Sequence, residues 1–193
     1  KAKISNDLHV HVVGAGTMGG DIAAWCAFKG MRVTLQDQTP ERLSAAFRRA
    51  HSLYKKKLRQ PHLVQAVMDR LQPDIDGAGV ASADIVIEAI FEDLTAKHAL
   101  YRSIEPQLKP GAFIATNTSS IPLDELHVVL KNPSRLVGIH FFNPVSKMQL
   151  VEVVKSSCTN TEVFEQAMAF VGCIGKLALP VKSKPGFLIN RCL

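Results

Sequence analysis

The feature that most restricts the fold of this chain is a glycine-rich loop between an expected strand and an expected helix. Residues 8–14 alternate β-branched and other apolar side chains and lead into Gly14-Ala15-Gly16-Thr17-Met18-Gly19. A helix is expected over residues 17–29, where Gly30 ends it, and residues 31–37 again have the composition of a strand. This order predicts a βαβ unit with two parallel strands.

The loop matches the G-x-G-x-x-G pattern of dinucleotide-binding folds, and its place between a strand and a helix strengthens the match. Gly14 permits the turn, Gly16 lets the backbone approach a pyrophosphate, and Gly19 allows the helix and strand to pack closely. The N-terminus of the helix adds N–H donors and a partial positive charge. The plainer alternative is that these glycines only tighten a turn.

Asp37 ends the second expected strand, close to the spacing of about 20 residues at which such folds place a ribose-binding acid. Its carboxylate would accept hydrogen bonds from the ribose hydroxyls and would repel a 2′-phosphate. NAD is therefore the expected cofactor rather than NADP. Arg42 is the nearby side chain that keeps NADP open as an alternative.

Helices and strands alternate along the rest of the chain. Helices are expected over residues 40–59, 62–71, 94–108, 123–129 and 161–171, and strands over residues 83–89, 112–116, 135–142, 150–155 and 176–181. The two helices after the second strand form a helical excursion. We predict an α/β fold over residues 1–184: a doubly wound, mostly parallel, Rossmann-like sheet whose last two strands run antiparallel at one edge.

Composition and charge exclude several classes of protein. The 193 residues are 47% hydrophobic and 21% charged and contain no apolar run long enough to span a membrane, so a soluble, intracellular globular protein is expected. The four cysteines lie far apart, which predicts reduced packing residues and no metal site.

The net charge is +6, and much of the basic excess lies in residues 48–59, RRAHSLYKKKLR. This segment is interpreted as a solvated helix face or as a site for a phosphorylated small ligand. Nucleic acid is not an expected partner, because the aromatic side chains of a recognised binding motif are missing.

His140 and Glu152 form a second candidate site. Glu152 lies within the apolar strand LVEVV, where an unpaired buried carboxylate would be costly, so a basic side chain should face it. An imidazole paired with a carboxylate is a general base suited to neutral pH. The alternative for His140 is a core histidine bonded to the backbone.

Asn117-Thr118-Ser119-Ser120 follows the strand at residues 112–116 and therefore lies at the carboxyl edge of the sheet, where open α/β folds bind ligands. Hydroxyl groups at this edge can hold a substrate oxygen. A turn or a helix cap is the alternative role for Ser120.

Five segments together resemble the 3-hydroxyacyl-CoA dehydrogenase family: VVGAGTMGGDIA, IVIEAIFEDLTAK, ATNTSSI, GIHFFNPVSKMQLVEVV and KPGFLINR. They occur in family order from about residue 8 to the end, and HFFNP…LVEVV is far more specific than the glycine motif. The leading segment KAKISNDLHVHVVGAGTMGG is similar to the junction between an enoyl-CoA hydratase region and the dehydrogenase region of multifunctional fatty-acid oxidation proteins.

The resemblance implies roles for individual residues. The catalytic set would be His140 as the base, Glu152 as its partner, Ser119 as the contact to substrate and nicotinamide, and Asn190 as the substrate-orienting asparagine. The implied cofactor contacts are Gly14, Gly16, Gly19, Asp37, Glu92, Lys97, Ser119 and Asn143. The implied contacts to the phosphates of CoA are Ser52, Lys56, Lys57 and Arg59.

The resemblance also implies an activity and a setting. The activity is NAD-dependent oxidation of L-3-hydroxyacyl-CoA to 3-ketoacyl-CoA in fatty-acid β-oxidation, in the cytoplasm of a bacterium. Residues 185–193 would begin the linker to an all-helical C-terminal domain that closes the acyl-binding cleft, and a hydratase domain and a thiolase subunit would be further partners. Two alternatives stay open: a catalytically silent, crystallin-like dinucleotide-binding module, and a dehydrogenase of free hydroxy acids.

Overall fold

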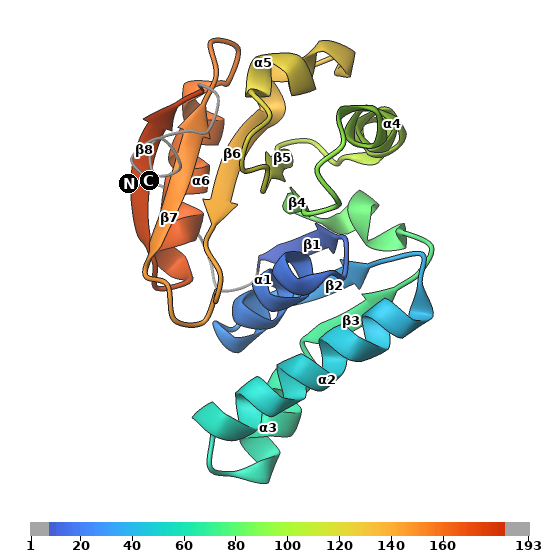
Figure 1. Cartoon of the computed structure of the whole chain (residues 1–193), viewed down its shortest axis with the longest axis vertical. Helices are drawn as coiled ribbons and strands as arrows, with labels where there is room; N and C mark the ends of the chain where they lie inside the picture. The colour runs from blue at the N-terminus through green and yellow to red at the C-terminus, as the bar shows by residue number, and fades with distance from the viewer. Residues whose placement is uncertain (1–7, 184–193) are drawn as a thin grey trace.

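One sheet forms the central layer of the molecule (Figure 1). The computed structural model describes residues 8–183, and its eight strands lie in the order β3-β2-β1-β4-β5-β6-β7-β8. The strands are β1 (His9–Val13), β2 (Arg32–Gln36), β3 (Leu71–Asp74), β4 (Ile85–Glu88), β5 (Phe113–Thr116), β6 (Leu136–Phe141), β7 (Leu150–Lys155) and β8 (Leu177–Lys182). The predicted linker at residues 185–193 lies outside the described residues.

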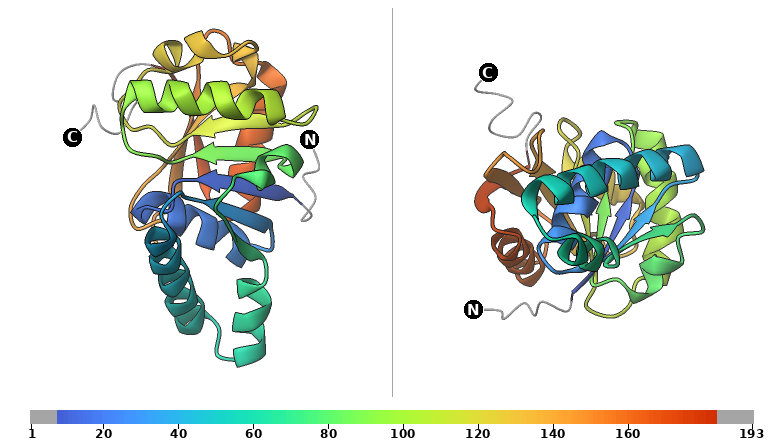
Figure 2. Two further views of the ribbon diagram at one scale, coloured as in Figure 1. Left: turned by 90° about the vertical axis from the view of Figure 1, so that its right-hand side faces the viewer. Right: turned by 90° about the horizontal axis from the view of Figure 1, so that it is seen from below.

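Helices cover both faces of the sheet (Figure 2). The helices are α1 (Thr17–Phe28), α2 (Pro40–Lys57), α3 (Pro61–Met68), α4 (Leu94–Ile104), α5 (Leu123–Leu126) and α6 (Thr161–Cys173), with short 3-10 turns η1 (Ala78–Ser82), η2 (Glu105–Gln107), η3 (His127–Val129) and η4 (Pro133–Arg135). One apolar core lies between the sheet and α1, α2, α3 and α6, and a second lies between the sheet and α4 and α5. Helices α2 and α3 extend beyond the sheet as an arm (Figure 2).

The predicted fold class is confirmed. Every residue of β1, β4, β5 and β6 is buried. This burial is what near-continuous apolar strands require in a parallel sheet that is covered on both faces. The strand pairs from β3 to β6 are all parallel, and β6 pairs antiparallel with β7.

Two local predictions need correction, and the antiparallel direction of the last two strands at one edge is confirmed. The helix expected over residues 62–71 ends at Met68, and the chain then forms the edge strand β3, whose Pro73 is tolerated because an edge strand leaves one side unpaired. Strands β7 and β8 both run against the rest of the sheet but are parallel to each other. Cys26 is a buried packing residue as expected, whereas Cys158 and Cys173 are exposed.

The carboxyl ends of the parallel strands meet at one edge of the sheet. The glycine loop follows β1, Asp37 follows β2, and Glu92 lies in the loop after β4. Ser119 comes after β5 and Asn143 after β6. The topology therefore brings side chains that are far apart in sequence to a single edge.

Two histidines on the same side of β1 are built into a chain of hydrogen bonds, a setting that the sequence analysis did not anticipate. His9 Nε2 and His11 Nδ1 lie 2.9 and 2.7 Å from Thr34 Oγ1, and His11 Nε2 lies 2.9 Å from Gln36 Oε1. An amide oxygen only accepts, so His11 carries its proton on Nε2 and accepts from Thr34 at Nδ1. Burial is the main cause that lowers the pKa of both histidines below 6.5.

We expect the fold to lose stability as the pH falls. The lowered pKa keeps both histidines neutral in the native state, while the unfolded chain takes up protons below about pH 6.5. The free energy of unfolding, measured in urea, should therefore fall by about 1 kcal/mol or more between about pH 7 and pH 5. The variant His11→Gln should show a shallower pH slope, and an unchanged slope would contradict this explanation.

Candidate active site

The glycine loop combines two crowded positions with one open position. A Cβ on Gly14, whose φ is 102°, would lie 2.5 Å from the Ala89 carbonyl oxygen, and a Cβ on Gly19 would lie 1.8 Å from the Gly14 oxygen. Neither position accepts a side chain while β1, β4 and α1 keep their packing. Around Gly16, in contrast, a Cβ would meet no atom within 4 Å. The backbone of the loop therefore borders open space at Gly16.

Asp37 holds this loop in place. Its Oδ2 accepts a hydrogen bond of 2.8 Å from the Ala15 N–H, and its Oδ1 accepts one of 2.9 Å from the Thr39 N–H. The Gly14 N–H donates to the Gln36 carbonyl at 2.8 Å, so the ends of β1 and β2 are joined directly. Each carboxylate oxygen has a second acceptor site, which leaves Asp37 able to accept from ribose hydroxyls.

A cleft of about 1080 Å³ opens beside the loop. Its lining comes from the ends of β1, β2 and β4, from the starts of α1 and α2, and from one side of α4. Asp37 and Arg42 are the charged side chains in this lining, within the described part of the chain. The rest is mainly small and apolar, and Phe91 is 68% exposed at its wall.

Glu92 organises the loop after β5. Its Oε1 accepts hydrogen bonds from the Thr118 hydroxyl and from the N–H groups of Ser119 and Ser120, the last two at 3.0 and 3.1 Å. Burial alone would raise the pKa of Glu92, but the Thr118 hydrogen bond, the nearby charge of Lys97 and the donors of Ser119 and Ser120 lower it to about 2. Glu92 is therefore a carboxylate at any ordinary pH.

Glu88 is the anchor beneath this loop, and the sequence analysis missed it. This carboxylate is fully buried at the end of β4 and accepts from Lys97 Nζ at 2.6 Å, Tyr101 Oη at 2.9 Å and Thr116 Oγ1 at 2.7 Å. Lys97 is 1% exposed and also pairs with Glu92 at 3.3 Å. The sequence signal was available: Glu88 is an acid in an apolar strand, the same pattern that singled out Glu152.

His140 and Glu152 meet as the sequence predicted. They are directly opposite each other in the antiparallel pair β6–β7, and His140 Nδ1 lies 2.8 Å from Glu152 Oε2. Glu152 is fully buried and His140 is 6% exposed. A carboxylate cannot donate, so the bonded Nδ1 carries hydrogen, and in the neutral form of the imidazole the lone pair belongs to Nε2.

One hydrogen bond connects the segment of His140 with the loop after β5. The N–H of Phe141, next to His140, donates to Asn117 Oδ1 at 2.9 Å, and Asn117 begins the loop that carries Ser119. Ser119 is half-buried and Asn143 is exposed in the loop after β6. Asn190 lies outside the described residues.

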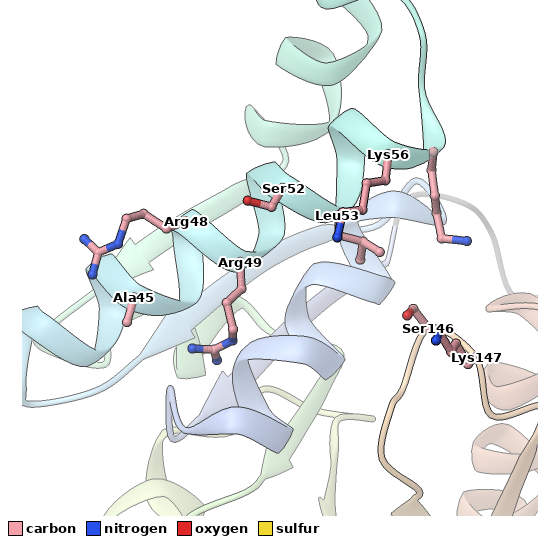
Figure 3. Close-up of a pocket in the computed structure, with 9 residues that line it drawn as sticks. Ala45, Arg48, Arg49, Ser52, Leu53, Lys56, Ser146 and Lys147 are labelled. Carbon is pink, nitrogen blue, oxygen red and sulfur yellow. The ribbon is translucent and has the colours of Figure 1, made fainter.

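The basic segment of α2 lines a second pocket of about 780 Å³ (Figure 3). Ser52, Lys56 and Lys57 line it as expected, whereas Arg59 does not. The opposite wall is Ser146 and Lys147 from the loop between β6 and β7 (Figure 3). Arg48 and Arg49 also line the pocket. The sequence analysis noted them as part of the basic segment but did not name them as contacts to CoA.

The residues at the first cleft fit a dinucleotide. Open space at Gly16 admits a pyrophosphate against the backbone, the first N–H groups of α1 lack helical partners, and Asp37 stands where a ribose would be bound. Separately, the His140–Glu152 pair can accept a proton. Among residues 8–183 no cluster of three His, Cys, Asp or Glu side chains has the arrangement of a metal site. No helix in this range is long and apolar enough to cross a membrane.

Comparisons with known proteins agree with this geometry. A family model described as 3-hydroxyacyl-CoA dehydrogenase, NAD binding domain, matches residues 9–184. The chain is 37% identical over 186 residues to the fatty acid oxidation complex subunit alpha of Psychrobacter sp. (strain PRwf-1). That match covers 94% of this chain and 26% of the relative, so the chain spans about a quarter of that protein.

Solved structures show the same likeness. The 3-hydroxybutyryl-CoA dehydrogenase of Escherichia coli K12 superposes with a TM-score of 0.91 at 37% identity, over 97% of this chain and 40% of that one. The (S)-3-hydroxybutyryl-CoA dehydrogenase of Ralstonia eutropha gives a TM-score of 0.88 at 32% identity, over 95% and 66%. The chain therefore belongs to the family of 3-hydroxyacyl-CoA dehydrogenase NAD-binding domains, and its cofactor is NAD.

Proposed function

We propose that the protein takes part in the NAD-dependent oxidation of L-3-hydroxyacyl-CoA to 3-ketoacyl-CoA in fatty-acid β-oxidation. The observation that carries the proposal is the buried His140–Glu152 pair, with Nδ1 and Oε2 2.8 Å apart. It lies at the same sheet edge as the dinucleotide cleft. The family membership and the names of the similar proteins support it.

In this proposal His140 is the general base. With Glu152 accepting from Nδ1–H, the lone pair of Nε2 takes the proton of the substrate hydroxyl as the carbonyl forms. The imidazole becomes a cation in that step, and the charge of Glu152 stabilises it because the pair is shielded from water. The hydrogen bond to the buried Glu152 also fixes the orientation of the imidazole ring, so the ring does not have to turn for the proton transfer.

Bound NAD would supply the acceptor for the hydride that leaves the substrate carbon. The chain's own contribution is to orient the reactants. Ser119 is proposed to hold the substrate oxygen, and the hydrogen bond from its backbone to Glu92 fixes its loop. Glu92 and Lys97 serve as the support of that loop, Asn143 as a nicotinamide-side contact and Asn190 as the substrate-orienting residue.

The CoA part of the substrate is assigned to the basic pocket on α2. Ser52, Lys56 and Lys57 line it together with Lys147. Arg59 is kept as a CoA contact only on the resemblance, since it does not line that pocket. The basic lining also supports a thioester of CoA over a free hydroxy acid, whose single carboxylate needs no such pocket.

A longer protein is part of the proposal. The similarity to an alpha subunit of a fatty acid oxidation complex supports further domains, including a C-terminal helical domain reached through residues 185–193 and a hydratase domain, together with a thiolase subunit. A bacterial cytoplasmic location is proposed on the same basis. The catalytically silent module is the weaker alternative, because a silent protein has no need of a buried histidine–carboxylate pair.

Replacing the base should abolish turnover without affecting cofactor binding. His140→Gln keeps a donor for the buried Glu152 carboxylate but cannot accept the substrate proton. NADH formation from a 3-hydroxyacyl-CoA by the full-length protein should fall by about 10²–10⁴-fold. The Kd of NAD, measured by calorimetry, should stay within about twofold, and turnover close to wild type would refute the assignment of the base.

Asp37 should govern the choice between NAD and NADP. Asp37→Asn removes the charge but keeps an acceptor, and we expect NAD binding to weaken by about tenfold while NADP binding improves relative to it. Glu41→Gln is the matched control, because Glu41 is an exposed carboxylate at the start of α2, close to Asp37 in sequence, and does not line the cleft. Equal effects of the two variants on NAD binding would refute the proposal that Asp37 binds the ribose.

Glu92 should affect catalysis through the Ser119 loop. Glu92→Gln loses the charge that gathers the donors of Thr118, Ser119 and Ser120, so kcat should fall by about tenfold with a smaller change in the Kd of NAD. Since the pKa of Glu92 is lowered from 4.5 to about 2, its contribution to stability should be present above pH 4.5 and be lost progressively as the pH falls from 4.5 to about 2. Glu125→Gln, an exposed carboxylate on α5, should change neither quantity.

A further inference from the structure

Three lysines gather around Trp25 of α1, and one of them, Lys57, also lines the basic pocket. The ammonium groups of Lys176, Lys29 and Lys57 lie 4.4, 4.9 and 5.3 Å from the centre of the indole ring. Lys29 and Lys57 also share the ring of Phe28, at 5.9 and 5.7 Å. The three lysines come from α1, α2 and the turn before β8, so the fold and not one helix assembles them.

Lys176 is the fixed member of this lysine cluster. It is 9% exposed, and its Nζ donates to the Val145 carbonyl and, at 2.6 Å, to the Met148 carbonyl. These bonds attach the turn before β8 to the loop that forms the opposite wall of the basic pocket. An ammonium group has three N–H donors, so one donor of Lys176 remains beyond the two carbonyls.

The positive charge of the cluster is not balanced. Within residues 8–183, carboxylates lie within 4.0 Å of Arg49, Lys97 and Lys109 but of none of the three clustered lysines. Burial lowers the pKa of Lys176, and the charges of Lys29 and Lys57 lower it further. Attraction to the indole face favours each cation singly and does not remove their mutual repulsion.

We propose that Lys29, Lys57 and Lys176 form a binding site for a phosphate group beside Trp25, connected to the basic pocket through Lys57. A phosphate monoester carries a charge of about −1.5 to −2 and three acceptor oxygens, which suits three ammonium groups better than a carboxylate does. The proposal rests on the proposed function for one source of this phosphate, the 3′-phosphate of a CoA thioester in the pocket. Free phosphate is the other source.

Trp25 allows the site to be observed directly, because it is the single tryptophan of the chain. Its ring touches the cations that an anion would draw away or immobilise, so binding should change the indole fluorescence. The 193-residue chain is titrated with inorganic phosphate, with CoA and with 3′-dephospho-CoA, and chloride at equal ionic strength serves as the blank. Excitation at the red edge of the indole band avoids absorption by adenine.

The decisive variants remove the two peripheral lysines. Lys29→Gln with Lys57→Gln takes away two charges and leaves Lys176 to hold the loop. Lys55→Gln with Lys131→Gln is the matched control, since it removes the same charge from exposed lysines outside the cluster. Circular dichroism and urea unfolding establish that both double variants fold.

In wild type, CoA should bind about tenfold more tightly than 3′-dephospho-CoA, and the lysine-cluster variant should reduce this ratio to about one. The control variant should keep the ratio. A response to inorganic phosphate that the cluster variant loses supports the site and identifies free phosphate as a ligand.

Equal binding of CoA and 3′-dephospho-CoA, together with no response to phosphate, overturns the proposal. So does a cluster variant that responds like wild type. These outcomes are independent of NADH formation: a protein that binds phosphate at Trp25 but does not oxidise a hydroxyacyl-CoA would refute the proposed function and keep the site.

Discussion

The need to partner every buried carboxylate determines how the carboxyl edge of the sheet is built. Glu88 and Glu152 are both fully buried, and each would be prohibitively costly alone. Lys97, Tyr101 and Thr116 satisfy Glu88, while His140 faces Glu152. The first arrangement fixes a loop, and the second orients an imidazole ring. The same physical constraint thus yields a lysine–carboxylate pair on β4 and a histidine–carboxylate pair on β6, and the two differ in the partner of the carboxylate.

The cations on the α2 side of the molecule lack the close partners that the buried carboxylates have. At the carboxyl edge Glu88 and Glu152 have internal partners, whereas none of the lysines around Trp25 has a carboxylate within 4.0 Å among the described residues. Cations without such partners repel one another and attract anions. The proposed acid–base pair and the proposed anion site therefore consist of different residues.

Sequence patterns predicted those parts of the protein in which a residue type has few physical alternatives. The glycines next to crowded backbone, the acid at the end of β2 and the carboxylate in an apolar strand each permit one arrangement, and the structure has it at Gly14, Asp37 and Glu152. Prediction failed where tertiary contacts decide. Strand β3 contains a proline and no apolar alternation, so only its pairing with β2 makes it a strand. No sequence pattern predicted the lysine cluster, because Lys29, Lys57 and Lys176 are far apart in sequence. They meet through the packing of α1, α2 and the turn before β8.

Arg49 connects the cleft beside the glycine loop with the basic pocket on α2. Its guanidinium donates to the Gly16 carbonyl at 3.0 Å and pairs with Asp21 at 3.2 Å, while the same side chain lines the basic pocket. Gly20 makes this possible, because a Cβ there would lie 2.7 Å from Arg49 Nη2. The carbonyl of Gly16 is thus held from the α2 side while the open space around this residue stays available for a pyrophosphate. Helix α2 consequently does more than carry basic residues for the second pocket: through Arg49 it also fixes the backbone conformation on which the dinucleotide site depends.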